Sequence, residues 1–115
     1  MTGNIQSKSF SFAVRIVKLC RLLRTDRKEH ILSKQLLRCG TSIGANVAEA
    51  QHAQSRADFQ SKLNIALKEA SETEYWLRLL EATEYLSTAE FESIYKDCDE
   101  LVKILISSVK TIKTD

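Results

Sequence analysis

The residues best suited to chemistry in this sequence are basic and lie near its N-terminus. Six Lys and Arg residues fall between positions 15 and 28, on a predicted helix and the polar turn that follows it: Arg15, Lys18, Arg21, Arg24, Arg27 and Lys28. Guanidinium and ammonium groups attract phosphates by charge, without reading bases. These six residues are the candidate nucleic-acid contacts. The same pattern also fits a solvated helix face that forms ion pairs with neighbouring helices.

Charge is divided unevenly along the chain. Residues 1–56 hold ten Lys/Arg and three Asp/Glu, whereas residues 57–115 hold seven and twelve, and the whole chain has a net charge of +2. The first half is therefore basic and the second half acidic. Such asymmetry attracts a polyanion to one side, or docks the basic half of one subunit on the acidic half of the next.

Two spacings suggest enzymes, but each is incomplete. Glu49 and His52 form a Glu-x-x-His pair, which is half of a di-iron site in helical bundles, and the only other histidine, His30, has no such Glu. Arg24 and His30 have the spacing of a phosphate-binding Arg and a general base in helical-bundle ribonucleases, yet they bracket a predicted link. We expect no catalytic residues, no metal site and no cofactor.

A second set of polar residues is predicted to specify packing or a subunit interface. Ser42, Asn46 and Glu49 share one helical face, and Asn46 is expected inside the apolar seam, where a buried amide fixes register. Glu69 and Glu72 share a face of the next helix, and Glu72 is expected to accept from Asn46, from an arginine such as Arg15, or across a subunit boundary. The same set includes two aromatic residues with polar handles, Tyr75 and Trp76.

The elements that carry these residues are predicted to be helices. Pro is absent and Gly occurs three times, which leaves too few turn residues for a β or βαβ fold. Apolar periodicity predicts one domain over residues 1–115, with helices at about 8–25, 30–53, 56–85 and 88–112. Short links make consecutive helices antiparallel, so the predicted fold is an all-α, up-and-down antiparallel four-helix bundle.

Details of the pattern sharpen this prediction. Gly40 and Gly44 lie within the second helix and are expected to admit a close neighbouring helix rather than break it. Ser87 and Glu90 have the spacing of a capping box at the start of the fourth helix. That helix carries a second apolar stripe, which suggests a partner subunit: Tyr95, Val102, Val109 and Ile112.

The N-terminal residues are polar, unlike a signal peptide, and no apolar run is long enough for a membrane span. The three cysteines, Cys20, Cys39 and Cys98, each fall in an apolar run, and buried reduced thiols are the simplest interpretation. We therefore expect a cytoplasmic protein without membrane contact.

Two sequence blocks point to a family. Ser42-Ile43-x-x-Asn46-Val47-Ala48-Glu49, followed by Phe59 and the block from Ala66 to Leu77, resembles the bacterial four-helix-bundle proteins encoded by intervening sequences in 23S ribosomal RNA genes. These proteins are often labelled as a small-subunit ribosomal protein. The resemblance extends from about Phe10 to Ile112.

The resemblance implies a homo-oligomer, typically a homopentamer, without enzymatic activity. The accessory variability protein of diversity-generating retroelements is a more distant relative that binds nucleic acid and a reverse transcriptase. By analogy we expect a non-enzymatic scaffold that binds RNA, DNA or a ribonucleoprotein through the basic first helix. The alternative is a scaffold for another protein with no role in nucleic-acid binding.

Overall fold

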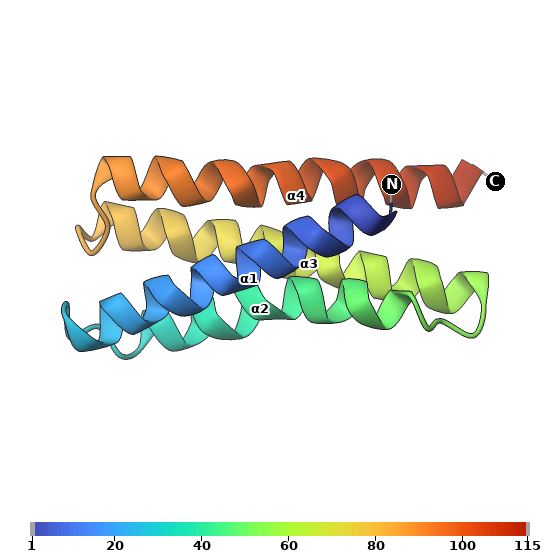
Figure 1. The fold of residues 1–115 in the computed structure, drawn as a ribbon. Helices are drawn as coiled ribbons and strands as arrows, with labels where there is room; N and C mark the ends of the chain where they lie inside the picture. Colours follow the sequence, from blue (N-terminus) through green and yellow to red (C-terminus); the bar gives the residue numbers. More distant parts are fainter. Residues whose placement is uncertain (1, 115) are drawn as a thin grey trace.

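Four helices make up most of the chain. The computed structural model describes residues 2–114, and the side chains of residues 4–111. In chain order the helices are α1 (Thr2–Thr25), α2 (Leu32–Ala50), α3 (Arg56–Ala82) and α4 (Thr88–Thr114). Consecutive helices run antiparallel in an elongated body of 46 × 21 × 19 Å (Figure 1). Residues 2–114 contain no strand, and the predicted all-α four-helix bundle is confirmed.

The helix bounds differ from the predicted ones mainly at the ends. The first helix begins at Thr2, earlier than predicted, and this extra turn buries Ile5 in the core. The second helix begins at Leu32 and ends at Ala50, so it is shorter at both ends than the predicted range of 30–53. The third helix ends at Ala82, since Glu84 adopts a positive φ of 69°, which cannot continue a helix. Among the residues that the structure describes, no helix is long and apolar enough to cross a membrane.

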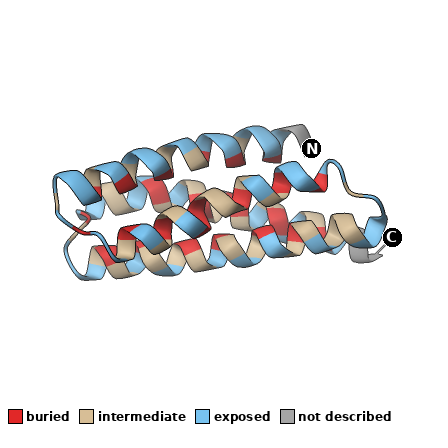
Figure 2. Cartoon of the chain, turned by 90° about the horizontal axis from the view of Figure 1, so that it is seen from below, coloured by how far each residue is buried: buried red, intermediate tan, exposed pale blue. Residues whose placement is uncertain are grey.

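The core is a single column of apolar side chains between the helices (Figure 2). The first helix contributes Phe12, Ile16 and Leu23, each at most 2% exposed. Their spacing of four and seven residues is the helical period that the sequence shows. Buried side chains from the other three helices complete the column, among them Leu36, Ile43, Leu77, Leu80, Leu101 and Leu105.

Gly40 brings α1 and α2 close together. A Cβ at this position would lie 2.9 Å from both Cγ1 and Cγ2 of Ile16, so only hydrogen leaves room for that side chain. At Gly44 a Cβ would lie 3.2 Å from the carbonyl oxygen of Ser9. The helix runs unbroken through both glycines. The prediction that they admit a close neighbour is confirmed.

Exposed apolar surface lies on α1 as well as on α4. On the fourth helix, Val109 is buried and Tyr95 and Val102 pack against the core, so most of this stripe is used within the chain. The side chain of Ile112 lies outside the described residues. The large exposed apolar residues of α1 are Phe10, which is 71% exposed, together with Val14 and Val17. Tyr95 and Val102 are only partly buried, and Ile106 on the same helix is 41% exposed, so a partner subunit on α4 stays a prediction.

Candidate functional site

Two of the six basic candidates are held by the fourth helix. Arg15 donates to Asp97 Oδ2 at 2.6 Å and to Ser93 Oγ at 2.9 Å. Arg27 donates to both carboxylate oxygens of Glu90, at 2.8 and 2.6 Å. These guanidinium groups bridge basic and acidic parts of the chain. Their charges are largely neutralised within the bundle.

The other four basic candidates are exposed at one end of the molecule. Within the part of the chain that the structure describes, none of them forms an ion pair with a carboxylate. They lie on the last turns of α1 and on the link after it, with Lys18 toward α4 and Arg21 and Arg24 toward α2. We call this group the cationic end: Lys18, Arg21, Arg24 and Lys28. Lys28 has a positive φ of 58°, which turns the chain away from the helix.

Of the two carboxylates of the link, Glu29 is turned to the backbone and Asp26 is exposed to solvent. Glu29 is only 7% exposed, and its side chain accepts from the amides of Leu32 at 3.0 Å and Ser33 at 2.6 Å, which caps α2. Desolvation opposes ionisation of Glu29, but these amide hydrogen bonds lower its pKa. Asp26 accepts from the hydroxyl of Thr25 at 3.0 Å. Neither acid pairs with Arg21 or Arg24.

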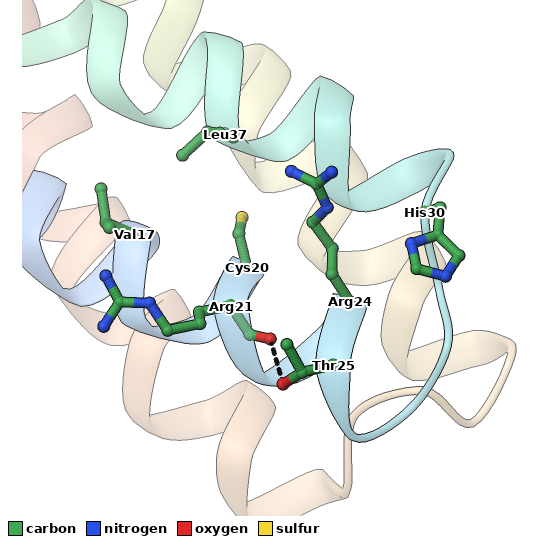
Figure 3. A pocket seen from close by; sticks show the side chains of 7 residues that line it. All are labelled: Val17, Cys20, Arg21, Arg24, Thr25, His30 and Leu37. Atoms are coloured by element: carbon green, nitrogen blue, oxygen red, sulfur yellow. Dashed lines mark hydrogen bonds between the residues drawn. The ribbon is translucent and has the colours of Figure 1, made fainter.

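An open hollow of about 400 Å³ lies beside the cationic end, between α1 and the start of α2. Figure 3 shows the Arg24 side chain reaching toward α2, with its guanidinium between Leu37 and His30, while Arg21 extends beside Val17. The thiol of Cys20 lies on the floor. The hollow therefore combines cations, an imidazole and apolar side chains.

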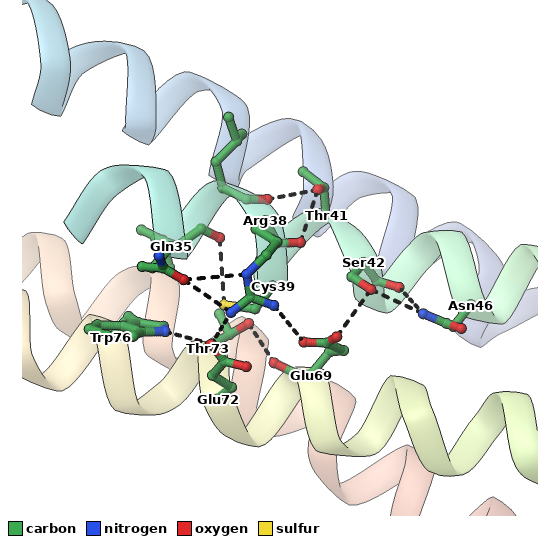
Figure 4. A network of polar contacts seen from close by, with 12 residues as sticks. Gln35, Arg38, Cys39, Thr41, Ser42, Asn46, Glu69, Glu72, Thr73 and Trp76 are labelled. Atoms are coloured by element: carbon green, nitrogen blue, oxygen red, sulfur yellow. Dashed lines mark hydrogen bonds and ion pairs between the residues drawn. The ribbon is translucent and has the colours of Figure 1, made fainter. Parts of the chain in front are cut away.

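The predicted polar residues of the second and third helices form a network (Figure 4). Asn46 Nδ2 donates to Ser42 O and Oγ at 2.9 and 3.0 Å, and Ser42 Oγ donates to Glu69 Oε2 at 3.4 Å. Asn46 is half-buried, so its expected place inside the apolar seam is wrong. The reason is register: Val47, one residue later, points into the core.

Glu72 has partners that the sequence analysis did not name. Its carboxylate pairs with Arg38, and it accepts from Trp76 Nε1 at 2.9 Å. Neither Asn46 nor Arg15 is its donor, because Asn46 is satisfied on its own helix and Arg15 by the fourth helix. The network thus ties α2 to α3.

The remaining two members of the predicted polar set lie at the surface. Glu49 pairs with Lys62 across the two helices, at 2.9 Å. Tyr75 is 58% exposed, and its ring packs edge-on against Trp76 with centroids 5.1 Å apart. The structure therefore brings Ser42, Asn46, Glu69 and Glu72 together, and leaves Glu49 and Tyr75 at the edge of that group.

A second hollow of about 540 Å³ lies on the same side of the molecule as the first, toward the other end of the helix pair. Exposed Phe10 borders it, and small residues of α2 form its wall: Thr41, Gly44, Ala45 and Ala48. His52 also borders it, while Glu49 is engaged by Lys62. The Glu-x-x-His pair therefore faces no second set, and residues 4–111 hold no group of three potential metal ligands.

Two important residues were missed in the sequence. Arg38 joins Glu69 and Glu72 to the network, and its position four residues before Ser42 places it on the same helical face. Phe10 begins an exposed row with Val14 and Val17, at spacings of four and three. Both signals were present as helical spacing, but the sequence does not tell an exposed row from a buried one.

The sequence blocks and the four-helix bundle can now be compared with known families. The family model described as 23S rRNA-intervening sequence protein matches residues 2–107. The chain belongs to this family. The family match covers all four helices except the end of α4, so the resemblance seen in the sequence blocks is confirmed.

A solved member of the S23 ribosomal protein family, a protein of unknown function from Bacteroides thetaiotaomicron VPI-5482, is similar to this member of the 23S rRNA-intervening sequence family. It is 58% identical, with a TM-score of 0.93, and the match covers 96% of this chain and 99% of that one. No curated protein matches the chain. Neither the family description nor that of the solved structure names a catalytic activity.

Proposed function

We propose that this protein is a non-enzymatic, homo-oligomeric scaffold that binds nucleic acid or a ribonucleoprotein through its cationic end. One observation carries the proposal. Arg15 and Arg27 are paired with carboxylates, whereas Lys18, Arg21, Arg24 and Lys28 are exposed without such partners in the described chain. Free cations gathered at one end of a helix favour a polyanion.

Binding of this kind is electrostatic. Phosphate contacts release counterions, so affinity falls with salt and depends little on sequence. A single cationic end makes few contacts, but an oligomer repeats it. Several subunits bound to one strand then convert modest attraction into avidity.

The surface proposed for self-association is formed by Phe10 and Val14, beside the second hollow on α2. Its occupant is a second copy of this chain, because the acidic half of one copy complements the basic half of another. Phe10 and Arg24 are fourteen residues apart on one helix, about 21 Å, so contacts at Phe10 leave the cationic end accessible. A homopentamer is the assembly that we propose.

The test is fluorescence anisotropy of labelled single-stranded RNA and duplex DNA, over a salt series from about 50 to 200 mM. The variant with Arg21→Glu and Arg24→Glu is expected to lose binding while its mass by light scattering stays that of the wild type. A matched control places the same charge change on two exposed lysines of the acidic half, Lys68→Glu with Lys96→Glu. At the upper end of the salt series, where the general effect of net charge is screened, the affinity of this control for nucleic acid is expected to be within about twofold of the wild-type affinity.

Other outcomes separate the alternatives. If the wild type binds no nucleic acid at low salt, the nucleic-acid proposal is wrong, and the alternative of a scaffold for another protein is favoured. If the arginine variant loses mass as well as binding, those arginines belong to the subunit interface. Metal analysis of the purified protein is expected to show well under one equivalent of iron, manganese or zinc, and a stoichiometric metal would contradict the non-enzymatic proposal.

A further inference from the structure

The hollow at the cationic end has a lining that differs from a plain basic surface. Arg21 and Arg24 supply two planar cations, His30 supplies a ring, and Val17 and Leu37 supply apolar walls. A surface that binds only phosphate requires positive charge but no apolar side chains. This mixture instead suits a ligand with an anionic group joined to a planar, weakly polar ring.

The charges of the hollow are also uncompensated. Glu29, in the adjoining link, is occupied by backbone amides, and exposed Asp26 forms an ion pair with neither arginine of the hollow. Within the described chain, neither Arg21 nor Arg24 has a carboxylate partner. A ligand phosphate therefore does not have to displace an ion pair before it binds.

The volume of the hollow limits the size of the ligand that it can hold. Its volume of about 400 Å³ lies near the lower end of small-molecule sites, which span roughly 300–1,000 Å³. That volume suits one nucleotide unit and not the width of a duplex. A base reaches the walls only if it leaves its stack, which single strands allow and duplexes resist.

We propose that this hollow is a subsite for one unstacked nucleotide of a single strand, with Arg21 on its phosphodiester and Arg24, His30 and Leu37 around its base. The proposal rests on the proposed function and adds to it a preference for single strands. The side chain of Arg24 has the central part, because it lies between the ring of His30 and the wall at Leu37. Guanidinium planes stack on bases as well as binding phosphate.

The experiment compares a labelled single-stranded RNA with the duplex made from the same strand, at one salt concentration. His30→Ala is expected to weaken single-strand binding about five- to tenfold and duplex binding less than about twofold, as for one stacking contact. His30 is exposed, so the fold should be unaffected. The matched control is His52→Ala, which removes the chain's other histidine from the far end of α2 and is expected to change neither affinity.

A second pair of variants keeps the charge constant. Arg24→Lys retains the positive charge but loses the planar group, and is expected to weaken single-strand binding about fivefold with little effect on the duplex. Arg78→Lys makes the same change at an exposed arginine of α3, outside both the hollow and the cationic end, and is the control. Circular dichroism and light scattering on every variant check that fold and mass are unchanged.

The outcomes distinguish this proposal from the proposed function. Equal affinity of the wild type for both probes, or equal losses on both in His30→Ala and Arg24→Lys, would overturn the subsite while leaving electrostatic binding intact. Absence of binding to either probe would overturn both. Selective loss on the single strand in both variants, with both controls unchanged, supports the subsite.

Discussion

The guanidinium of Arg27 donates two hydrogen bonds to the carboxylate of Glu90, at 2.8 and 2.6 Å. The same carboxylate accepts from the Ser87 amide at 2.8 Å, and Ser87 Oγ accepts from the Glu90 amide at 3.1 Å. These two bonds are the capping box that the sequence predicts at the start of α4. Arg27 thus fastens the link after α1 to the start of α4, which explains why it is not a free phosphate contact.

Glu90→Gln is expected to lower stability at pH 7 by about 1 kcal/mol, since the pair is partly exposed to solvent. The hydrogen bond from Arg27, and then that from the Ser87 amide, lowers the pKa of Glu90 from 4.5 to about 2. A carboxyl with a depressed pKa stabilises the fold above the unfolded value and loses that effect as pH falls. Urea unfolding between pH 7 and pH 3 should therefore show the gap to wild type narrowing below about pH 4.5. A gap that is constant with pH, or equal to that of exposed Glu92→Gln, would contradict this role.

Glu74 is expected to act in the opposite direction. Its Oε2 is buried without a hydrogen-bond partner in the described chain, and burial, followed by the nearby charge of Asp99, raises its pKa. A folded state with a raised carboxyl pKa holds its proton to higher pH than the unfolded chain, so stability falls as pH rises through that range. Glu74→Gln should therefore raise the urea midpoint above that of the wild type at pH 7, and this difference should shrink as the pH is lowered toward 4. Glu81→Gln, seven residues further along α3, is the control, and an equal shift there would refute the assignment to Glu74.

The sequence predicts the fold well because the buried residues recur at the helical period along the chain. Phe12, Ile16 and Leu23 follow the helical period and are all buried, and Ser87 and Glu90 cap the helix that their spacing predicts. Helix ends were harder, since Lys28 and Glu84 adopt left-handed conformations that glycine usually marks. No local signal reveals that Glu29 caps the second helix through three amides.

The candidate site was predictable as a set of charges but not as an arrangement. Equal spacing of Arg15, Lys18, Arg21 and Arg24 gives no sign that α4 holds the first of these and leaves the others free. That distinction depends on Asp97, which is distant in sequence and comes close only in the bundle. The same holds for Arg38 and Glu72, whose pairing requires the register between two helices.

Gly40→Ala is expected to destabilise the protein by about 1–3 kcal/mol, despite the better helix propensity of alanine, because the new Cβ would meet Ile16 at 2.9 Å. In an Ile16→Ala background the obstructing carbons are gone, and the same change is expected to add stability by filling space and favouring the helix. A double-mutant cycle by urea unfolding measures this reversal of sign. If Gly40→Ala is equally harmful in both backgrounds, the contact with Ile16 is not what requires glycine.

The three thiols are expected to be unreactive while the protein is folded. Burial raises the pKa of Cys20 to about 12 and that of Cys39 to about 11, and it raises the pKa of Cys98 further. The thiolate is the reactive form, so each cysteine is both shielded and protonated at neutral pH. Ellman's reagent should therefore modify none of them in the native protein within minutes at pH 8, and all three in denaturant. Rapid modification of one thiol in the native protein, assigned by mass spectrometry, would contradict this and identify local opening of its helix. If that thiol is Cys20, which lines the hollow beside Arg24, a single strand bound in the hollow is expected to slow its modification.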